Sequence, residues 1–326
     1  MKNKLCIFGA LTTLVAGISH AQSPATPYPT RPIRFVVGFA AGGPTDVIAR
    51  ITGQDMGAAL GQTVVVENRA GANAQIATEL VARATPDGHT LLFSSLSLLV
   101  NSILLQEKAK YDPFKDFAPI SLAATLPMVV VTSPSTKINT LQELLAAAKA
   151  KPGAITYGAP GHGGSGHLAG ALLENLSGAK MTTIPFRGNA PALTDVMAGQ
   201  VTFMFYPMVG IAEQVASKRL RALAVGTAKR HPDFAEVPTM AESGFPGFEE
   251  TAPWVGLLAP AGTPKAIVER LSVEMRKSLA KPETITRLKA LGAITVGDTP
   301  DEYLKFLKKD HERWARVIKA SGVKAE

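Results

Sequence analysis

The residues best suited to bind a ligand begin with the stretch Phe39–Asp46, which reads FAAGGPTD. It joins an apolar, β-branched run to a segment with helical periodicity. We therefore expect it at the carboxyl edge of a sheet, where ligands bind in open α/β proteins. Its glycines let the backbone approach a ligand closely, and the N–H groups of the helix start favour an anion. Two roles stay open for Asp46: bonding to the helix N–H groups, or direct contact with the ligand.

A second candidate stretch, Gly158–His167 (GAPGHGGSGH), again lies between an expected strand and an expected helix. Three interpretations compete: a second anion-binding helix start facing the first, a nucleophilic Ser165 assisted by His167, and a flexible loop. The G-x-S-x-G elbow of serine hydrolases is not met, because His167 stands where the second glycine belongs. His162 and His167 do not have the H-E-x-x-H spacing of zinc sites, so neither a metal nor a cofactor is predicted.

The third candidate runs from Pro185 through Arg187 to Asp195 and also leads from a strand into a helix. Arg187 is able to hold a ligand carboxylate with two parallel hydrogen bonds, and the alternative is a surface or interdomain ion pair. The sequence contains neither G-x-G-x-x-G nor G-x-x-x-x-G-K-[ST], so no nucleotide cofactor is expected. Polar, glycine-rich loops at the strand ends of two units suggest two lobes that close on one ligand.

The elements that position these loops alternate between strand and helix, which predicts sheets of parallel strands flanked by helices. The expected strands are 33–39, 63–67, 90–94, 128–132, 155–158, 182–186, 201–206, 220–225 and 254–259. The expected helices are 46–60, 75–84, 168–176 and 191–198, together with three that begin at Thr140, at Thr263-Pro264 and at Thr299.

Composition sets the broad class of the protein. The chain has 326 residues, a formal charge of +8, 46% hydrophobic residues and one cysteine. This length suggests about two domains, and the single cysteine excludes a disulfide scaffold. The basic residues are scattered and form no nucleic-acid-binding module, so nucleic acid is not an expected partner.

The first residues have the pattern of a secretory signal peptide. Lys2 and Lys4 precede the apolar stretch Leu5–Ile18, and Ser19-His20-Ala21 fits a cleavage site after Ala21. The alternative is an N-terminal membrane anchor, but the stretch is shorter than a comfortable membrane span. We expect residues 1–21 to be removed and the mature protein to lie in the periplasm.

Motifs along the whole mature chain resemble those of the Bug/TctC family, the periplasmic solute-binding receptors of tripartite tricarboxylate transporters. They are Tyr28-Pro29-x-Arg31-Pro32-Ile33-Arg34, Phe39-Ala40-Ala41-Gly42-Gly43-x-x-Asp46, Leu60-Gly61-Gln62, Glu67-Asn68-Arg69, Pro86-Asp87-Gly88-His89, Tyr111-Asp112-Pro113, Ser165-Gly166-His167-Leu168-Ala169, Pro185-Phe186-Arg187-Gly188, Val237-Pro238-Thr239 and Ala259-Pro260-Ala261-Gly262-Thr263-Pro264. After Arg69 the family usually has a glycine-rich stretch, and here Asn73 and Gln75 introduce polar side chains instead.

The resemblance implies a two-lobed α/β fold, in which each lobe is a mainly parallel sheet flanked by helices and the ligand cleft lies between the lobes. Lobe 1 would comprise 28–125 plus 251–326, and lobe 2 would comprise 126–250, with crossings near 123–127 and 244–254. The family implies ligand-binding residues on both sides of the cleft. From lobe 1 they are Phe39, Ala40, Ala41, Gly42, Gly43, Thr45 and Asp46, and from lobe 2 they are Gly163, Gly164, Ser165, Arg187, Gly188, Asn189 and Asp195. Ser94 is added from the sequence itself, because the hydroxyl-rich segment Ser94–Asn101 ends another strand of the first lobe and is expected to contact the distal half of the ligand.

The function that follows is that of a monomeric, non-enzymatic receptor. It would capture a small organic acid in the periplasm and present it to the membrane subunits of a tripartite tricarboxylate-type transporter. Two alternatives stay open: a secreted serine hydrolase using Ser165 and His167, and a carboxylate receptor that signals to a membrane sensor without transport. Phe39, Tyr206 and Trp254 could form pocket walls that favour an aromatic acid, or belong to the core.

Overall fold

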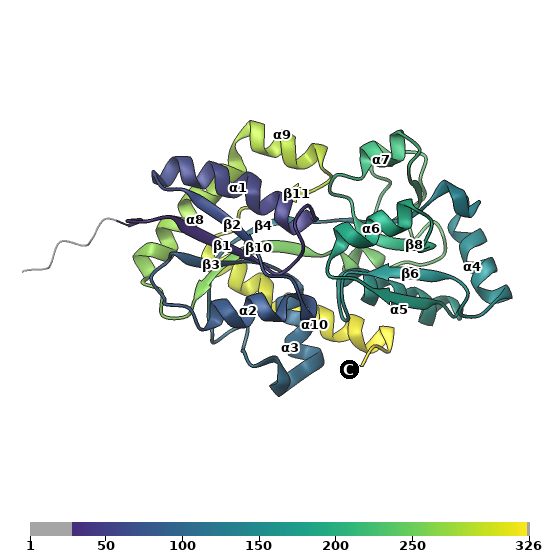
Figure 1. The fold of residues 1–326 in the computed structure, drawn as a ribbon, viewed down its shortest axis with the longest axis horizontal. Coiled ribbons are helices and arrows are strands. Elements are labelled where there is room, and N and C mark those ends of the chain that lie inside the picture. Colours follow the sequence, from purple (N-terminus) through teal and green to yellow (C-terminus); the bar gives the residue numbers. More distant parts are fainter. Residues whose placement is uncertain (1–27, 325–326) are drawn as a thin grey trace, which may run out of the picture.

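The computed structural model describes residues 28–324, so the expected signal peptide and its cleavage after Ala21 lie outside the described residues. Two sheets, each flanked by helices, form the two lobes of an elongated molecule (Figure 1). The chain builds three strands of the first sheet, crosses to the second sheet after a fourth, and returns after β9.

Lobe 1 is built on a six-stranded sheet of order β11-β4-β10-β3-β1-β2. Its strands are β1 (Ile33–Val37), β2 (Val64–Asn68), β3 (Thr90–Ser95), β4 (Phe117–Thr125), β10 (Trp254–Pro260) and β11 (Ile294–Thr295). The apolar side chains of α1 (Pro44–Leu60), α8 (Lys265–Ala280) and α9 (Pro282–Ala290) pack on one face. Those of α2 (Gln75–Ala82), α3 (Ser97–Leu105) and α10 (Pro300–Ser321) pack on the other.

Lobe 2 is built on a five-stranded sheet of order β7-β6-β8-β5-β9. Its strands are β5 (Met128–Thr132), β6 (Thr156–Ala159), β7 (Thr182–Pro185), β8 (Phe203–Pro207) and β9 (Arg221–Val225). Helices α4 (Leu141–Ala150) and α5 (Ser165–Ser177) cover one face, and α6 (Asn189–Met197) and α7 (Ala212–Ala216) cover the other.

The two-lobed α/β architecture is confirmed, but the sheets are mixed where mainly parallel sheets were expected. Strands β1, β2 and β3 pair in parallel, as do β7, β6 and β8. Strand β10 is antiparallel to both β3 and β4, and β5 is antiparallel to both β8 and β9. Strands β5 and β10 are each the first that the chain forms after crossing between the lobes, and each enters its sheet from the crossing side. The two-residue strand β11 is also reversed, since it is antiparallel to β4.

The expected elements occur close to their predicted bounds, and five further strands and helices lie where none was assigned: β4, α3, α7, α9 and β11. Helix α10 begins with the predicted capping box, in which the Thr299 hydroxyl accepts from the Glu302 N–H and the Glu302 carboxylate accepts from the Thr299 N–H. Helix α8 begins one residue later than expected, at Lys265, with Pro264 as its N-cap.

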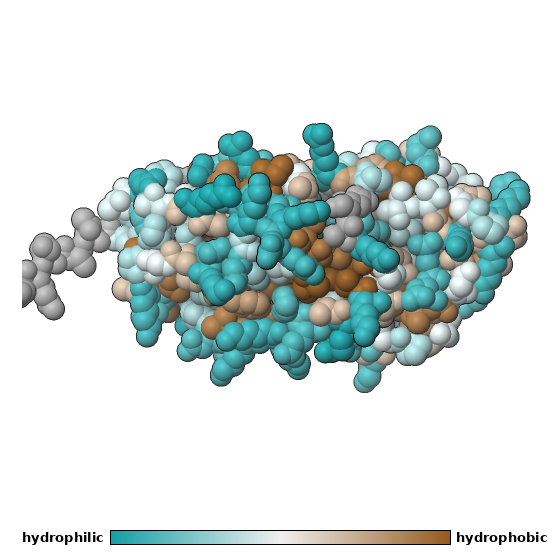
Figure 2. Space-filling model, turned by 90° about the horizontal axis from the view of Figure 1, so that it is seen from below, coloured by the Kyte–Doolittle hydropathy of each residue, from teal (hydrophilic) through white to brown (hydrophobic). Residues whose placement is uncertain are grey.

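A third contact joins the lobes in addition to the two crossings. The C-terminal part of α10 lies beside α5 (Figure 1), where the Asn175 side chain donates to the Ala320 carbonyl. The His162 ring lies 2.8 Å from the Lys324 carbonyl. Figure 2 shows an apolar area near the middle of one long face, framed by hydrophilic residues. Within residues 28–324, no helix combines the length and the apolar character that a membrane span requires.

Candidate functional site

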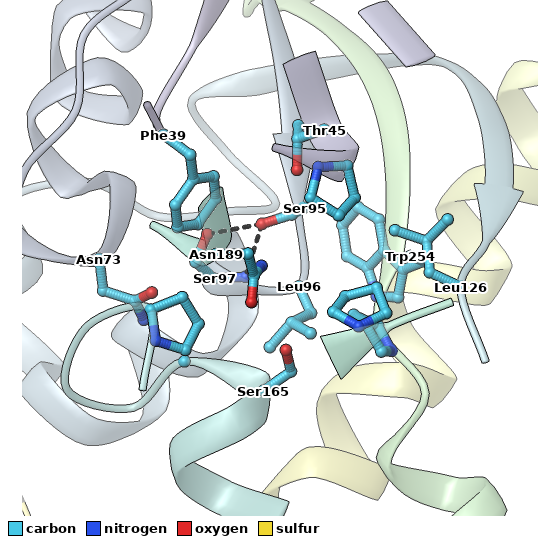
Figure 3. A pocket seen from close by; sticks show the side chains of 15 residues that line it. Phe39, Thr45, Asn73, Ser95, Leu96, Ser97, Leu126, Ser165, Asn189 and Trp254 are labelled. Carbon is cyan, nitrogen blue, oxygen red and sulfur yellow. Dashed lines mark hydrogen bonds between the residues drawn. The ribbon is translucent and has the colours of Figure 1, made fainter. Parts of the chain in front are cut away.

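A small cavity, called the inner cavity below, lies between the lobes (Figure 3). Its volume is about 30 Å³, room for one or two water molecules. Both lobes contribute to its wall. The lining residues are Phe39, Pro44, Thr45, Asn73, Ser95, Leu96, Ser97, Leu126, Pro160, Gly164, Ser165, Asn189, Pro207, Pro253 and Trp254.

Four helices begin at this cavity. Pro44 and Thr45 open α1, Ser97 opens α3, Ser165 opens α5 and Asn189 opens α6. None of the four N-cap residues accepts a helix N–H bond through its side chain, whereas α4 and α10 are capped by threonines. Helix starts carry unsatisfied N–H groups and a partial positive charge. Their convergence makes the inner cavity favourable for an anion.

Local sequence explains why the helices start here. Each start follows the carboxyl end of a strand, namely β1, β3, β6 or β7. Pro44 occupies the first turn of α1, where its missing N–H costs no hydrogen bond. Gly163 has a φ of +72° directly before the α5 N-cap, and Gly188, the α6 N-cap, has a φ of +142°. Residues with a side chain rarely adopt such angles, so glycine is the natural choice at both positions.

The inner cavity is polar but neutral. Its lining residues are all uncharged, and they offer the hydroxyl groups of Thr45, Ser95, Ser97 and Ser165. The hydroxyl oxygens of Ser95 and Ser97 lie 2.8 Å apart. Figure 3 shows Ser165 below the cavity and Thr45 above it, on helices from opposite lobes. An anion in this cavity would be held by hydroxyl groups and backbone dipoles rather than by an ion pair.

A larger space, called the outer chamber below, adjoins the inner cavity and shares Phe39, Asn73 and Pro160 with it. Its volume is about 340 Å³. Two of its lining residues, Arg187 and His162, come from lobe 2 and carry or can acquire a positive charge. The remaining lining residues are Gly38, Gly71, Ala72, Ala74, Gln75, Asn101, Leu104, Leu105, Gly161, Pro185 and Phe186.

Asp46 holds the first loop in shape. Its carboxylate accepts the Gly42 N–H at 2.9 Å, the Asn68 amide at 3.0 Å and the Arg50 guanidinium at 3.0 Å. Burial alone would raise the pKa of Asp46, but these hydrogen bonds bring the pKa below its usual value. Among the described residues these bonds include none to a backbone N–H group of α1, so the expected bond to the helix start is not found, and Asp46 supports the loop before the helix instead.

The structure brings some of the expected binding residues to the cavities and leaves others outside them. Phe39, Thr45, Gly164, Ser165 and Asn189 line the inner cavity, and Arg187 lines the outer chamber with Phe39. The expected residues that line neither space are Ala40, Ala41, Gly42, Gly43, Asp46, Ser94, Gly163, Gly188 and Asp195.

Two of those residues, Ala40 of lobe 1 and Gly188 of lobe 2, lie against each other across the cleft instead. The Ala40 N–H of lobe 1 donates to the Arg187 carbonyl of lobe 2 at 3.4 Å. A methyl group added at Gly188 would lie 3.2 Å from the Ala40 nitrogen, so only glycine permits this close approach without a shift. Here the two lobes are in direct backbone contact.

Several residues that line the inner cavity were not chosen individually from the sequence. Ser95 and Ser97 belong to the hydroxyl-rich segment Ser94–Asn101, which was expected near the ligand but from which only Ser94 was chosen as a binding residue. Asn73 was noted as a departure from the family pattern that changes the polarity of the pocket. Of the three aromatic wall candidates, Phe39 and Trp254 line the inner cavity, whereas Tyr206 is buried in the core of lobe 2.

A two-lobed α/β molecule with a cavity for an anion between the lobes has the architecture of a periplasmic binding protein. Residues 48–323 match the model of the tripartite tricarboxylate transporter family receptor (TctC), and the chain belongs to this family of solute-binding receptors. It is 37% identical over 325 residues to BugT of Bordetella pertussis, covering 99% of both chains.

Two solved relatives from Rhodopseudomonas palustris are described with their ligands. One, solved with adipate, is 31% identical with a TM-score of 0.88, and the match covers 92% of this chain and 100% of the relative. The other, MatC with bound malate, is 32% identical with a TM-score of 0.84, and the match covers 89% of this chain and 100% of the relative. These likenesses confirm the resemblance to the Bug/TctC receptors.

Proposed function

We propose that this protein binds a small organic carboxylate in the inner cavity and delivers it, in the periplasm, to the membrane subunits of a tripartite tricarboxylate-type transporter. The observation that carries the proposal is the convergence of four helix starts on one neutral cavity. Hydrogen bonds from such donors to a carboxylate contribute about 1.5–3 kcal/mol each. The two relatives solved with adipate and malate support the same ligand class.

Ligand entry requires the lobes to separate. The inner cavity lies between the lobes and is lined by both of them, so the ligand enters an open form that then closes around it. We place the two lobes at 28–125 plus 251–326 and at 126–250, with the hinge in the crossings near 123–127 and 244–254. The Ala40–Arg187 backbone contact would break on opening and form again on closing.

Binding roles follow from position in the closed form. Thr45, Ser97, Ser165 and Asn189 would donate to the ligand carboxylate through side chains and helix N–H groups. Gly42, Gly43 and Asp46 would keep the first loop in shape, and Arg187 would act at the cleft entrance. We also propose a monomeric receptor that carries an N-terminal signal peptide cleaved after Ala21.

A serine hydrolase is the competing candidate, and one contact weighs against it. The Nδ1 atom of His167 accepts the Gly163 N–H at 2.9 Å, so the neutral ring carries its proton on Nε2. In this tautomer both ring nitrogens are engaged, and neither has a lone pair to remove the Ser165 proton. An esterase assay on the wild type and Ser165→Ala tests this: a serine-dependent turnover would establish the hydrolase.

A signalling receptor uses the same closure and differs only in its membrane partner.

The proposal is tested by a melting-temperature screen against mono-, di- and tricarboxylic, amino and aromatic acids. A ligand at 100 times its Kd stabilises the protein by about 2.7 kcal/mol, which corresponds to several degrees. Solution scattering with a hit from the screen should show a smaller radius of gyration than for the free protein. No shift with any acid, measured on protein refolded to remove bound solutes, would contradict carboxylate binding. An unchanged radius at saturation would contradict closure.

A further inference from the structure

The side chain of Asn73 presents an unpaired hydrogen-bond acceptor at the inner cavity. Asn73 is 8% exposed, and its Oδ1 atom has no hydrogen-bond partner among residues 28–324. The orientation of the amide is fixed by its neighbour. Asn73 Nδ2 donates to Asn101 Oδ1 at 3.0 Å, while Asn101 Nδ2 donates to the Asn73 carbonyl at 3.0 Å. Turning the Asn73 amide over would place two oxygens against each other, so Oδ1 is the end left without a partner.

The backbone holds Asn73 in place at a cost. Ala72, Asn73 and Ala74 have φ angles of 45°, 48° and 69°, a left-handed run without glycine. Such conformations persist when the surroundings impose them, and they are concentrated at ligand sites. The Asn73 side chain lies against the glycine loop of lobe 2, because a methyl group built on Gly164 would be 3.5 Å from Oδ1. The acceptor therefore lies beside the start of α5, on the boundary between the inner cavity and the outer chamber.

A carboxylate cannot satisfy this acceptor, because an ionised carboxylate accepts hydrogen bonds and donates none. The Oδ1 atom of Asn189, on the lobe 2 side of the same cavity, is also buried and unpaired among the described residues. An unsatisfied buried acceptor costs free energy that a donor on the ligand would recover. The cavity thus combines donors suited to a carboxylate with an acceptor suited to a second, hydrogen-bond-donating group.

We propose that the Asn73 carboxamide oxygen selects a carboxylate that bears a hydroxyl group over the same acid without it. The proposal rests on the proposed function and names its ligand class. A hydroxyl fits better than an ammonium group, because the residues lining the inner cavity offer no carboxylate to pair with a buried positive charge. Malate and adipate, the acids bound by the two solved relatives, differ in this respect: malate carries a hydroxyl and adipate does not.

The test measures affinity for acids that differ by one hydroxyl group. The pairs are malate and succinate, lactate and propionate, and 3-hydroxybenzoate and benzoate, with aspartate as the ammonium analogue of malate. Titration calorimetry on the mature protein should give about 5- to 150-fold tighter binding of the hydroxyl-bearing acid in the pair that fits. Aspartate should bind more weakly than malate.

A matched pair of variants assigns the preference to Asn73. Asn73→Gly removes the carboxamide and suits the left-handed backbone, so the variant should fold. It should lower the hydroxyl preference, which is the ratio of the two affinities within an acid pair, to less than about threefold. Ala72→Gly makes the same backbone change at the neighbouring left-handed residue and should keep the wild-type preference.

The outcomes separate the two proposals. If no acid in the panel binds, the proposed function fails and the selection of a hydroxyl fails with it. If acids bind and each pair has equal affinities in the wild type, carboxylate binding stands and the hydroxyl selection is overturned. If Asn73→Gly retains the full preference, the assignment to Asn73 is overturned. If aspartate binds more tightly than malate, an ammonium ligand replaces the hydroxyl-bearing one.

Discussion

The inner cavity and the outer chamber lie between the same lobes and share Phe39, Asn73 and Pro160, yet they differ in charge. The inner cavity is lined by neutral residues and receives four helix starts. The outer chamber includes Arg187, a permanent cation on a long side chain. One space therefore offers fixed dipoles, whereas the other offers a movable charge.

The difference shows how a carboxylate can be bound without a buried ion pair. A buried guanidinium loses its hydration whenever the cleft is empty, and that desolvation is costly. Helix N–H groups and hydroxyls are fixed by the fold, so they need little rearrangement when an anion arrives. A cation at the entrance can still attract the ligand from solution. We therefore assign affinity to the inner cavity and association rate to the outer chamber.

Ser165→Asp should have the largest effect, because it places a negative charge in the neutral inner cavity. An acidic residue at the start of a helix is favourable for the helix, so α5 should fold normally. The new carboxylate would occupy the inner cavity, where a second carboxylate must be repelled at short range in a nearly dry site. We expect a loss of affinity of roughly 100-fold or more, measured by calorimetry.

Gln142→Asp is the matched control, because Gln142 is an exposed residue in the first turn of α4. It should leave the affinity unchanged. Binding that survives in Ser165→Asp would mean that the ligand carboxylate does not lie at the start of α5.

The loops of the inner cavity could be predicted from sequence because chemistry and backbone geometry agreed there. Thr45, Gly164 and Ser165 follow strands and open helices, and the glycines beside them mark the turns. The role of Asp46 was left open between bonds to the helix N–H groups and direct contact with the ligand, since Asp favours helix starts as well as binding sites. The observed partners Gly42, Arg50 and Asn68 match neither alternative, and they show that the side chain supports the loop.

Other parts of the site could not be predicted, for reasons of topology and backbone. Trp254, a wall candidate by its residue type alone, is the first residue of β10 and reaches the cavity because this strand enters its sheet from the crossing side. The rule that looks for ligands after the ends of strands gives no reason to choose it over Tyr206. Asn73 lies in a left-handed run without glycine; asparagine tolerates that conformation, but the two alanines beside it give no sign of it. The reversal of β5 and β10 likewise depends on pairing between distant segments, which local patterns do not encode.

Gly188→Ala tests whether the close contact between the lobes at Ala40 and Gly188 contributes to ligand affinity. The added methyl group would meet the Ala40 nitrogen at 3.2 Å and hold the lobes slightly apart. We expect ligand affinity to fall about tenfold, because the closed form loses its backbone contact.

Gly178→Ala is the control for backbone strain, since Gly178 also has a positive φ, +68°, with open space around it. This variant should lower the free energy of unfolding by about 1 kcal/mol, seen as a slightly lower melting temperature, and keep the ligand affinity of the wild type. Equal affinities of the two variants would exclude a role for the Ala40–Gly188 contact in closure.

Arg187→Ala tests the assignment of rate to the outer chamber. Stopped-flow binding should show association slowed about three- to tenfold at low salt, with a weaker salt dependence than in the wild type. The affinity for a dicarboxylate should fall more than that for the matched monocarboxylate, because Arg187 is close enough to the entrance to meet a second acid group. An unchanged association rate together with a large rise in dissociation rate would mean that Arg187 contacts the bound ligand and does not act mainly at the entrance.

The smallest expected effect is on stability at low pH. It distinguishes an aspartate that supports the binding loop from one that only stabilises lobe 1. The pKa of Asp46 is lowered in the folded protein, so its contribution is fully present above the ordinary Asp pKa of about 3.9 and is lost as the pH falls below it. Asp55, bonded to Ser278, Lys281 and Thr284 in lobe 1, has a lowered pKa for the same kind of reason.

Asp46→Asn and Asp55→Asn should each lower the melting temperature at pH 7 by a few degrees, and the difference from wild type should shrink as the pH is lowered through about 4. Only Asp46→Asn should also weaken ligand binding, because Asp46 holds the loop that leads to Thr45 and the inner cavity. Melting curves and calorimetry at pH 7 check both statements. If Asp46→Asn binds the ligand as tightly as Asp55→Asn does, the shape of the Gly42–Asp46 loop does not govern the helix start that faces the anion.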